Sequence, residues 1–336
     1  MVRLSLKSPL SSTISLLFFF LFFTISFAEL CNPNDKKALL NIKKAFNNAY
    51  YFASWKPEED CCTWYSVDCD ENSHRIISLD ISTDNEISGQ IPPYIGDLPF
   101  LQSLMLHKLP NLVGPIQPTI AKLHNLKHLD ISWTNISGTI PDFLSSLSKL
   151  TYIRLSFSNL SGAIPSSLSK LPSLEFLQLD RSKLTGQIPY SFGDFKAKGF
   201  YLYLSHNKLS GKIPPSLSRV DFESVDLSRN KLEGDASMIF GEHRHTWKVD
   251  LSRNLLEFDM SKVVFSTSLF MLDLNHNKIY GGLPPQMTKL GNLNSFNVSY
   301  NRLCGQIPKG GELQRFDVYS YFHNKCLCGA PLESCK

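Results

Sequence analysis

The stretch YIRLSFSNLSGAIP (152–165) carries a pattern that recurs through most of this chain. The same frame occurs in HLDISWTNISGTIP (128–141) and in YLYLSHNKLSGKIP (201–214). Aligned on L-x-L-x-x-N-x-L-x-G-x-I-P, ten units follow one another at spacings of 23 to 25 residues. Their first strand positions are Leu79, Leu104, Leu129, Ile153, Leu177, Leu202, Val225, Val249, Leu272 and Phe296. Ten matches at a near-constant period predict a repeat architecture.

The frame is that of a leucine-rich repeat, in which each unit contributes one short strand and a return path. A single unit cannot bury its apolar side, so we expect the units to stack and to bury Leu129, Ile131, Ile136, Ile140 and their counterparts in one continuous core. Strands about 4.8 Å apart would form a curved sheet on the order of 45 Å long. The expected fold class is therefore an α/β solenoid of ten repeats with a cap at each end.

Polar and glycine positions inside the frame are expected to be structural. The fifth residue after the first strand position is often asparagine, and its amide can bond backbone groups at the bend and connect neighbouring units. These asparagines are Asn207, Asn230, Asn254, Asn277 and Asn301. A glycine permits the next turn, and the Ile-Pro pair ends it because proline has no amide hydrogen with which to continue strand pairing.

The first 28 residues have the features of a secretory signal peptide. Arg3 and Lys7 precede an apolar run at 14–28, and Ser26 and Ala28 supply the small residues of a cleavage site. No other run approaches about 20 apolar residues, so we expect a secreted chain without a membrane anchor. Loss of Arg3 and Lys7 lowers the formal charge from +4 to +2, which is too weak to indicate nucleic-acid binding.

Eight cysteines lie only near the two ends of the chain, which fits a protein that folds in an oxidising compartment. We expect an N-terminal cap at 29–75, repeats at 76–308 and a C-terminal cap at 309–336, with each cap covering an open end of the solenoid. The two clusters are too far apart to cross-link, and adjacent Cys61 and Cys62 are poor partners for each other. The preferred pairs are Cys31–Cys61, Cys62–Cys69, Cys304–Cys326 and Cys328–Cys335.

The N-terminal cap is expected to contain a helix over DKKALLNIKKAF (35–46), with Asn34 as its N-cap. Leu39, Leu40, Ile42 and Phe46 are its apolar residues. Trp55 and Trp64 are expected to help cover the first repeat.

The motif L-x-G-x-I-P resembles the plant-type subclass of leucine-rich repeats. The flanks SWKPEEDCCTWYSVDCD (54–70) and NVSYNRLCGQIPKGGELQRFDVYSYFHNKCLCGAPLESC (297–335) resemble those of the plant polygalacturonase-inhibiting proteins. The resemblance covers essentially the whole mature chain, and the repeat count agrees. It implies a secreted cell-wall protein that binds and blocks pectin-degrading endopolygalacturonases of fungi and sometimes of insects.

Side chains that alternate with the two apolar positions of each strand are expected to line the concave face. Between the apolar positions lie Asp80, Met105, Asp130, Arg154, Gln178, Tyr203, Asp226, Asp250, Asp273 and Asn297. Three residues further along each unit lie Thr83, Lys108, Trp133, Phe157, Arg181, His206, Arg229, Arg253, His276 and Tyr300. Aromatic residues gather in repeats 3 to 6 and basic or titratable residues in repeats 5 to 9, a segregation that a merely solvated surface does not require.

The resemblance implies roles for this surface. Concave aspartates of the family form an acidic pocket that faces the basic substrate cleft of the polygalacturonase, and Asp180 and Asp226 occupy matching places. The expected partner-binding residues are Arg154, Gln178, Asp180, Tyr201, Tyr203, Asp226 and Trp247. Family members bind pectin through basic residues, and the expected pectin-binding residues are Arg181, His206, Arg229 and Arg253. Alternatively, Asp226 pairs with Arg229 and Asp250 with Arg253 in exposed salt bridges of little energetic consequence.

Arg154 departs from the family motif, which usually has aspartate at this place. Opposite a basic enzyme cleft, attraction would become repulsion at this point. The side chain could instead pair with Asp130 or Asp180, or meet an acidic patch on a different target. We expect a narrower set of inhibited enzymes or weaker inhibition.

Three N-glycosylation sequons begin at Asn135, Asn159 and Asn297. We expect glycans on the first two, which lie in the bend after the strand, and partial occupancy of the third, which lies on the concave face. The two histidines of His243-Arg244-His245 lie in a polar loop without carboxylate or thiolate support, and they are expected to be surface residues rather than a metal site. No cofactor is expected.

Other functions remain as alternatives. A flat, repetitive face offers no obvious pocket for catalysis, so an enzyme is disfavoured. A secreted module that binds a peptide or a receptor in its concave groove is the first alternative. Ice binding, which occurs in a related protein, is the second; it requires a regular array of Thr or Asn, whereas the ladder positions here are mixed (Thr134, Ser158, Ser182).

Overall fold

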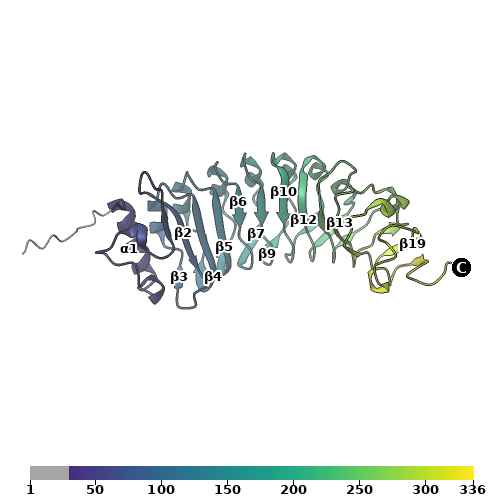
Figure 1. Cartoon of the computed structure of the whole chain (residues 1–336), viewed down its shortest axis with the longest axis horizontal. Coiled ribbons are helices and arrows are strands. Elements are labelled where there is room, and N and C mark those ends of the chain that lie inside the picture. The colour runs from purple at the N-terminus through teal and green to yellow at the C-terminus, as the bar shows by residue number, and fades with distance from the viewer. Residues whose placement is uncertain (1–29) are drawn as a thin grey trace, which may run out of the picture.

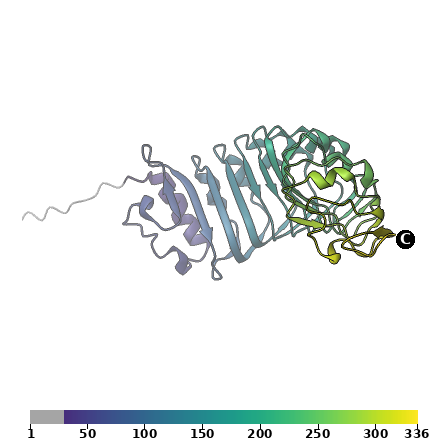
Figure 2. The same cartoon turned by 45° about the vertical axis from the view of Figure 1, so that its right-hand side comes forward.

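Parallel strands from successive repeats stack side by side into an elongated, curved solenoid in the computed structural model (Figures 1 and 2). The structure describes residues 30–336, and the expected signal peptide lies outside them. The N-terminal cap and the C-terminal segment lie at opposite ends of the solenoid (Figure 1). Within residues 30–336, none of the helices combines the length and the apolar character that a bilayer crossing requires.

One long sheet follows the repeats. It is parallel except for the first pair, in which β1 runs antiparallel to β2. First strand positions pair in register from Leu79 with Leu104 to Leu272 with Phe296, so the ten predicted repeats are confirmed. Its main path contains β1 (Val67–Cys69), β2 (Ile76–Ser82), β4 (Ser103–Gly114), β5 (His128–Gly138), β6 (Tyr152–Arg154), β8 (Phe176–Gln178), β10 (Lys198–Tyr203), β12 (Asp221–Asp226), β14 (Lys248–Asp250), β16 (Met271–Asp273) and β18 (Ser295–Asn297).

Further strands, several of which contain a glycine of the repeat frame, line a second side of the solenoid. They are β3 (Ser88–Gln90), β7 (Asn159–Ala163), β9 (Lys183–Thr185), β11 (Ser210–Lys212), β13 (Lys231–Gly234), β15 (Leu255–Leu256), β17 (Tyr280–Gly281), β19 (Arg302–Gln306) and β20 (Cys326–Cys328). Gly138 has φ +90° and Gly162 has φ +81°, a left-handed conformation that glycine adopts without a steric cost.

The return path of each of the first nine repeats is a short 3-10 turn rather than an α-helix. Prolines precede or begin most of these turns, and about five residues are too few for a stable α-helix. The turns in the repeats are η3 (Pro93–Asp97), η4 (Pro118–Lys122), η5 (Asp142–Ser146), η6 (Ser166–Lys170), η7 (Tyr190–Asp194), η8 (Pro215–Arg219), η9 (Ser237–Ile239), η10 (Met260–Lys262) and η11 (Pro285–Lys289). The caps add η1 (Tyr50–Phe52), η2 (Cys61–Thr63) and η12 (Val318–Ser320).

Asparagines at the predicted ladder positions connect neighbouring repeats. Asn254 Nδ2 donates to the main-chain oxygens of Leu227 in the preceding unit (3.0 Å) and of Leu251 and Ser252 in its own (both 3.2 Å). Its Oδ1 accepts from the amide of Leu232, also in the preceding unit (3.0 Å). The other four predicted ladder asparagines make the same set of bonds. The structural role predicted for them is confirmed.

The ladder continues into the C-terminal cap. Asn324 accepts from the amide of Leu303 (3.0 Å) and donates to the carbonyl oxygens of Val298 and Tyr321 (3.1 and 2.7 Å). β20 then pairs in parallel with β19. Part of the expected cap at 309–336 is therefore an eleventh, incomplete repeat that covers the end of the core.

The helix of the N-terminal cap begins two residues earlier than expected. α1 spans Pro33–Ala45, and its N-cap is Asn32, whose side chain accepts from the Asn34 amide at 3.0 Å. The prediction of Asn34 as N-cap is wrong because proline is favoured in the first helical turn, where its missing amide hydrogen costs no bond. Asp35 then forms a two-bond ion pair with Arg75 (2.7 and 2.8 Å), which holds α1 against the first repeat.

All four predicted disulfides are present. Cys31–Cys61 and Cys62–Cys69 close the N-terminal cap, and Cys304–Cys326 and Cys328–Cys335 close the C-terminal one. Trp55 and Trp64 are buried and stacked at 5.6 Å beside the first repeat, as expected.

The asparagine ladder predicts a specific stability effect. Asn254→Ala should lower the free energy of unfolding by about 2–3 kcal/mol, because buried backbone groups of two repeats lose their partners. Asn292→Ala is the matched control, since Asn292 makes one exposed bond, to the Thr267 carbonyl oxygen (3.1 Å). Urea unfolding of both variants tests this, and equal effects would contradict it.

Candidate functional site

Three aspartates form a row across neighbouring strands of the long sheet. Asp226 on β12 pairs in register with Asp250 on β14, and Asp250 with Asp273 on β16. The side chain of each bends toward its own strand: in Asp250, Oδ1 accepts from the amide (3.0 Å) and the hydroxyl (2.7 Å) of Ser252. Asp226 and Asp273 make equivalent bonds two residues on. These local bonds hold three carboxylates in fixed positions at the spacing of adjacent strands.

Burial, together with neighbouring carboxylates, raises the pKa of three aspartates in this region. Burial, together with the charges of Asp226 and Asp273, raises the pKa of Asp250 to about 6. Burial also raises the pKa of Asp273 and, with the charge of Asp226, that of Asp180. Asp250 therefore loses its negative charge in mildly acidic solution, in a range where an exposed aspartate stays ionised.

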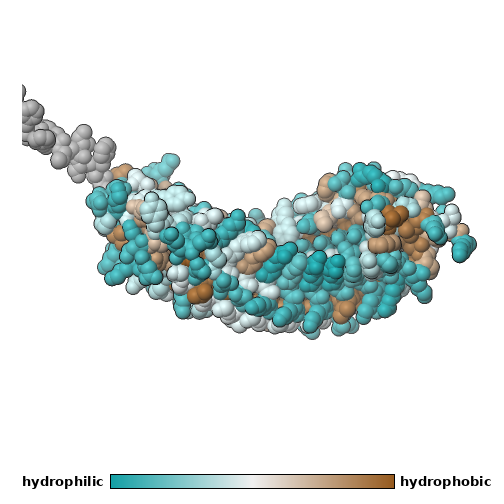
Figure 3. Space-filling view, turned by 90° about the horizontal axis from the view of Figure 1, so that it is seen from below, coloured by the Kyte–Doolittle hydropathy of each residue, from teal (hydrophilic) through white to brown (hydrophobic). Residues whose placement is uncertain are grey.

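The aspartates form the floor of a polar hollow of about 400 Å³. A second hollow of about 350 Å³ shares Asp180, Ser205 and Asp226 with it. The larger one is lined by Asp180, Arg181, Ser205, His206, Asp226, Ser228, Arg229, Asp250, Ser252, Arg253, Asp273 and Asn275. Figure 3 shows the molecule as an arc, hollowed along one side and hydrophilic over its middle. The expectation of a flat face is thus wrong here, because side chains from five strands surround a depression.

The basic column runs beside the aspartates. Arg181, His206, Arg229 and Arg253 occupy successive repeats with φ between +52° and +56°, a left-handed conformation uncommon for residues with side chains. Among the described residues, no carboxylate lies within salt-bridge distance of Arg229 or Arg253. The alternative of exposed pairs with Asp226 and Asp250 is therefore wrong, since both carboxylates turn to serines instead. Burial, with the charges of Arg181 and Arg229, lowers the pKa of His206.

Arg154 is paired rather than free. Its Nη1 lies 3.5 Å from Oδ2 of Asp130 on the neighbouring strand, and its Nε donates to the Ser156 hydroxyl (3.3 Å). Asp180, the other partner considered, accepts from Gln178 Nε2 instead (2.7 Å). Because the side chain of Asp130 is only 3% exposed, Arg154 presents the accessible charge of this pair.

An aromatic ladder, which was not predicted from the sequence, borders the smaller hollow. The rings of His128 and Tyr152 stack at 4.0 Å, and those of Tyr152 and Phe176 at 4.3 Å. Tyr201 and Tyr203 then lie 5.8 and 5.5 Å from Phe176. The sequence does contain a signal for this ladder. Four of these residues immediately precede the first strand position of their repeat and so fall in one column: His128, Tyr152, Phe176 and Tyr201. Because the stacked rings are nearly parallel, they present their edges rather than their faces to the groove. Together they form a rigid apolar strip.

Trp247 does not join this ladder. It lies one position further from the hollow, lines neither cavity, and packs edge-on against Phe270 at 6.4 Å. The structure brings the other expected partner-binding residues of the central repeats together, but it places Trp247 at the rim.

The other predicted positions have mostly structural surroundings. Asn135 is exposed, and Asn159 Nδ2 donates to its Oδ1 (3.0 Å). Asn297 Oδ1 accepts from the amide and the hydroxyl of Ser299 (3.0 and 2.7 Å), so this sequon is engaged with the sheet. His243 and His245 are exposed as expected.

Arg244 between these histidines is not a surface residue. Half-buried, it donates to four main-chain carbonyl oxygens, including those of Val220 (2.6 Å) and Ser218 (2.7 Å) in the preceding repeat. The wide guanidinium thus supplies bonds to backbone carbonyl groups around the irregular turn at η9.

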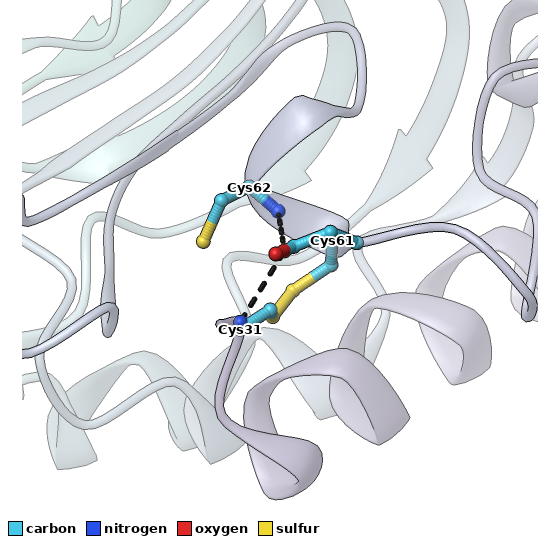
Figure 4. Close-up of side chains that lie close together, drawn as sticks. Cys31, Cys61 and Cys62 are labelled. Carbon is cyan, nitrogen blue, oxygen red and sulfur yellow. Dashed lines mark hydrogen bonds between the residues drawn. A yellow bond between two sulfur atoms is a disulfide. The ribbon is translucent and has the colours of Figure 1, made fainter. Parts of the chain in front are cut away.

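One cluster within residues 30–336 has ligand atoms close enough to hold a metal ion: Cys31, Asp60, Cys61 and Cys62 (Figure 4). All three sulfurs are in disulfides, which removes the thiolates that a metal would need. The Asp60 carboxylate accepts instead from the amides of Leu30 (2.8 Å), Cys31 (3.3 Å) and Cys62 (2.9 Å). Burial opposes ionisation, but these amides outweigh it and lower the pKa of Asp60. The cluster is a brace of the N-terminal cap.

The stacked frame, with one strand and one return path per unit, defines a leucine-rich-repeat protein. Matches to family models agree: a leucine rich repeat N-terminal domain covers residues 32–70, and leucine rich repeats cover 116–184 and 200–220.

Comparison with whole proteins narrows the family. Polygalacturonase inhibitor 1 of Arabidopsis thaliana is 61% identical over 97% of this chain and 99% of its own length. The polygalacturonase inhibitor of Pyrus communis is 64% identical over 92% and 93%. The chain belongs to the polygalacturonase inhibitor family. A crystal structure of a plant ice-binding protein is also similar, with a TM-score of 0.89 and 51% identity over 91% of this chain and 98% of that one.

The raised pKa of Asp250 predicts a pH-dependent stability. Because this pKa is higher in the folded than in the unfolded chain, folding binds protons between about pH 4 and 6, and the stability from this group is lost as the pH rises through that window. Asp250→Asn should therefore raise the free energy of unfolding at pH 7 by on the order of 1–2 kcal/mol and have little effect at pH 4. Asn297 makes the same bonds to Ser299, so the geometry tolerates asparagine.

Urea unfolding at pH 4 and pH 7 measures this difference. Asp97→Asn is the matched control, because Asp97 is half-exposed and paired with Lys122 (3.4 Å) outside the row. The same stability change at both pH values in Asp250→Asn would contradict the prediction.

Proposed function

We propose that this chain is a secreted inhibitor of endopolygalacturonases that acts by covering the enzyme with its concave face and has no catalytic activity of its own. The observation that carries the proposal is the 61–64% identity, over nearly the whole chain, to relatives named polygalacturonase inhibitors. The targets would be fungal or insect enzymes, and the site of action the plant cell wall.

The geometry of the concave face supports this proposal. The fixed carboxylates at the floor of the hollow would face a basic substrate cleft and attract it. They need no rearrangement on binding. The stacked rings beside them, Tyr152 and Phe176 with Tyr201 and Tyr203, provide rigid apolar area of the kind that anchors protein interfaces. Charge would orient the enzyme, and burial of the aromatic strip would hold it.

We propose that the basic column also binds homogalacturonan. Arg181, Arg229 and Arg253 stand in the same column, and no salt bridge in the described chain occupies Arg229 or Arg253. Guanidinium groups bind carboxylates through paired hydrogen bonds, which suits a polymer with one carboxylate per sugar. His206 would contribute charge only in acidic solution, since its pKa is lowered.

Ice binding is the second candidate because of the similar plant ice-binding protein. The surface of this protein does not suit ice binding. Ser132 and Ser156 are fully buried and offer no regular row of hydroxyl groups to ice, and the face around Asp226 is hollowed and charged. Absence of thermal hysteresis in the pure protein would dismiss this candidate.

The proposed inhibition is tested with the secreted protein against a panel of endopolygalacturonases, followed by release of reducing ends from polygalacturonate. Slowed release with at least one enzyme supports the proposal. Failure to bind any of them, together with tight binding to a plant peptide or a receptor ectodomain, would establish the peptide- or receptor-binding alternative instead.

Arg154 should weaken or narrow this inhibition. Arg154→Gln removes its positive charge and is expected to strengthen inhibition of an enzyme with a basic cleft about five-fold, the effect of about 1 kcal/mol for unit charges about 4 Å apart in water. Arg154→Asp restores the usual family charge, but it also faces buried Asp130, so the glutamine variant is the cleaner test.

Inhibition constants at low and high salt measure the effect of the Arg154 substitution. The control is Arg219→Gln, which removes a half-exposed arginine that pairs with Asp194 (2.8 Å) on the return path. Potent inhibition by the unaltered protein that does not respond to either Arg154 substitution would refute the proposed role of this residue.

Pectin binding should depend on the basic column. Replacing Arg229 and Arg253 together by Gln is expected to weaken polygalacturonate binding at least ten-fold, because each lost charge–carboxylate contact is worth about 1 kcal/mol or more. Added salt should mimic the effect, since exposed charges are screened within about 10 Å at 0.1 M. Calorimetry measures the binding, with Arg219→Gln as control. If neither salt nor the double substitution alters the binding, the basic column does not bind pectin.

A further inference from the structure

A separate hollow of about 770 Å³ lies at the N-terminal end of the solenoid. It shares no lining residue with the concave hollows. One part of its lining comes from the cap, with Tyr50, Tyr51 and Tyr65. The facing part is the loop that follows β2, with Asp84 and Glu86. The inhibitory surface proposed above uses none of these residues.

The tyrosine side of this N-terminal groove is held rigidly from beneath. The Tyr51 hydroxyl bonds to Ser66 Oγ (2.7 Å) and donates to the Asp80 carbonyl oxygen (3.1 Å). Trp55 Nε1 donates to the Tyr65 carbonyl oxygen (2.8 Å), which fixes the backbone that carries the Tyr65 ring. Tyr50 and Tyr65 are nevertheless 82% and 61% exposed. Two large rings are thus displayed to solvent on a backbone that has little freedom to withdraw them.

The acidic side is equally fixed. Asp84 Oδ1 accepts from the amides of Glu86 and Ile87 (both 2.7 Å), and Asn111 Nδ2 donates to the Asn85 carbonyl oxygen (2.7 Å) from the next repeat. These bonds leave the second Asp84 oxygen and the Glu86 carboxylate without a hydrogen-bond partner in the described chain. Both carboxylates can therefore interact with a ligand in the groove without losing an internal bond.

The charge of the lining selects the ligand. Two carboxylates and no Lys, Arg or His line the groove, although the chain as a whole is positively charged. Other exposed rings of this protein already carry a cation: Arg219 lies 5.8 Å from the centroid of Tyr190, and Arg75 lies 4.0 Å from that of Phe100. Neither Tyr50 nor Tyr65 has such a cation within residues 30–336. Electron-rich ring faces next to carboxylates attract an ammonium or guanidinium group.

We propose that this groove binds a lysine or arginine side chain presented by an extended segment of a protein partner. The cation would lie against the tyrosine rings and within reach of Asp84 and Glu86, and the preformed walls would lower the entropic cost of binding. Anionic pectin is disfavoured there by the same carboxylates. The groove is thus a second docking point: it prefers a cationic ligand, whereas the basic column prefers an anionic one.

The test uses the mature secreted protein and the acetylated peptide Gly-Lys-Gly-Lys-Gly as probe. Tyrosine nitration with peptide mapping reports protection of Tyr50 and Tyr65, and fluorescence titration gives the dissociation constant. Glu86→Gln and Tyr65→Leu should each weaken binding about three-fold, as expected for loss of an exposed charge or ring contact. Glu242→Gln and Tyr190→Leu, at exposed positions outside the groove, are the matched controls and should bind as the unaltered protein does.

Removal of the lysine charges gives the decisive comparison. The same peptide with Nε-acetyl-lysines should neither bind nor protect the tyrosines. Equal binding of both peptides, unchanged affinity in the two groove variants, or no protection at the highest soluble concentration would each overturn the proposal. Protection by neutral galactotetraose but not by the lysine peptide would overturn it in favour of a saccharide site.

Discussion

Hydrogen bonds between neighbouring repeats are the constraint on which the rest of this structure depends. A strand of three residues has little stability alone, and its bend has carbonyl groups that its own unit leaves unpaired. Asn254 and its counterparts bond the backbone of their own unit and of the preceding one with a single amide. Each repeat is therefore completed by the next, and stability is shared between nearest neighbours.

This dependence explains both caps. The first repeat is completed by β1, which turns antiparallel, and by α1 held through the Asp35–Arg75 pair. The last is completed by an eleventh, partial unit whose Asn324 ends the ladder. The disulfides lie only in these two regions, where the periodic bonding stops and fewer neighbours are available.

The same stacking makes the concave face a set of columns in which like residues are forced together at strand spacing. Burial and neighbouring carboxylates raise the pKa of Asp250, while Arg229 and Arg253 have no salt bridge within residues 30–336 because local serine bonds hold the carboxylates of Asp226 and Asp250. Relatives with the same frame carry inhibitor and ice-binding names. Fold alone therefore does not identify the function of a chain with this frame.

The sequence by itself determined the repeat number, the strand register, the ladder asparagines, the disulfide pairs and the columns, because each follows from a period or from short spacings along the chain. The predicted start of α1 was wrong by two residues, because Asn32 rather than Asn34 is the N-cap of the helix. Only the tertiary structure decided that Arg154 pairs with Asp130, that Tyr152 and Phe176 form a stacked strip, and that Arg244 bonds to the backbone of the preceding repeat. These depend on side-chain rotamers and on the curvature between strands, which distances along the chain do not specify.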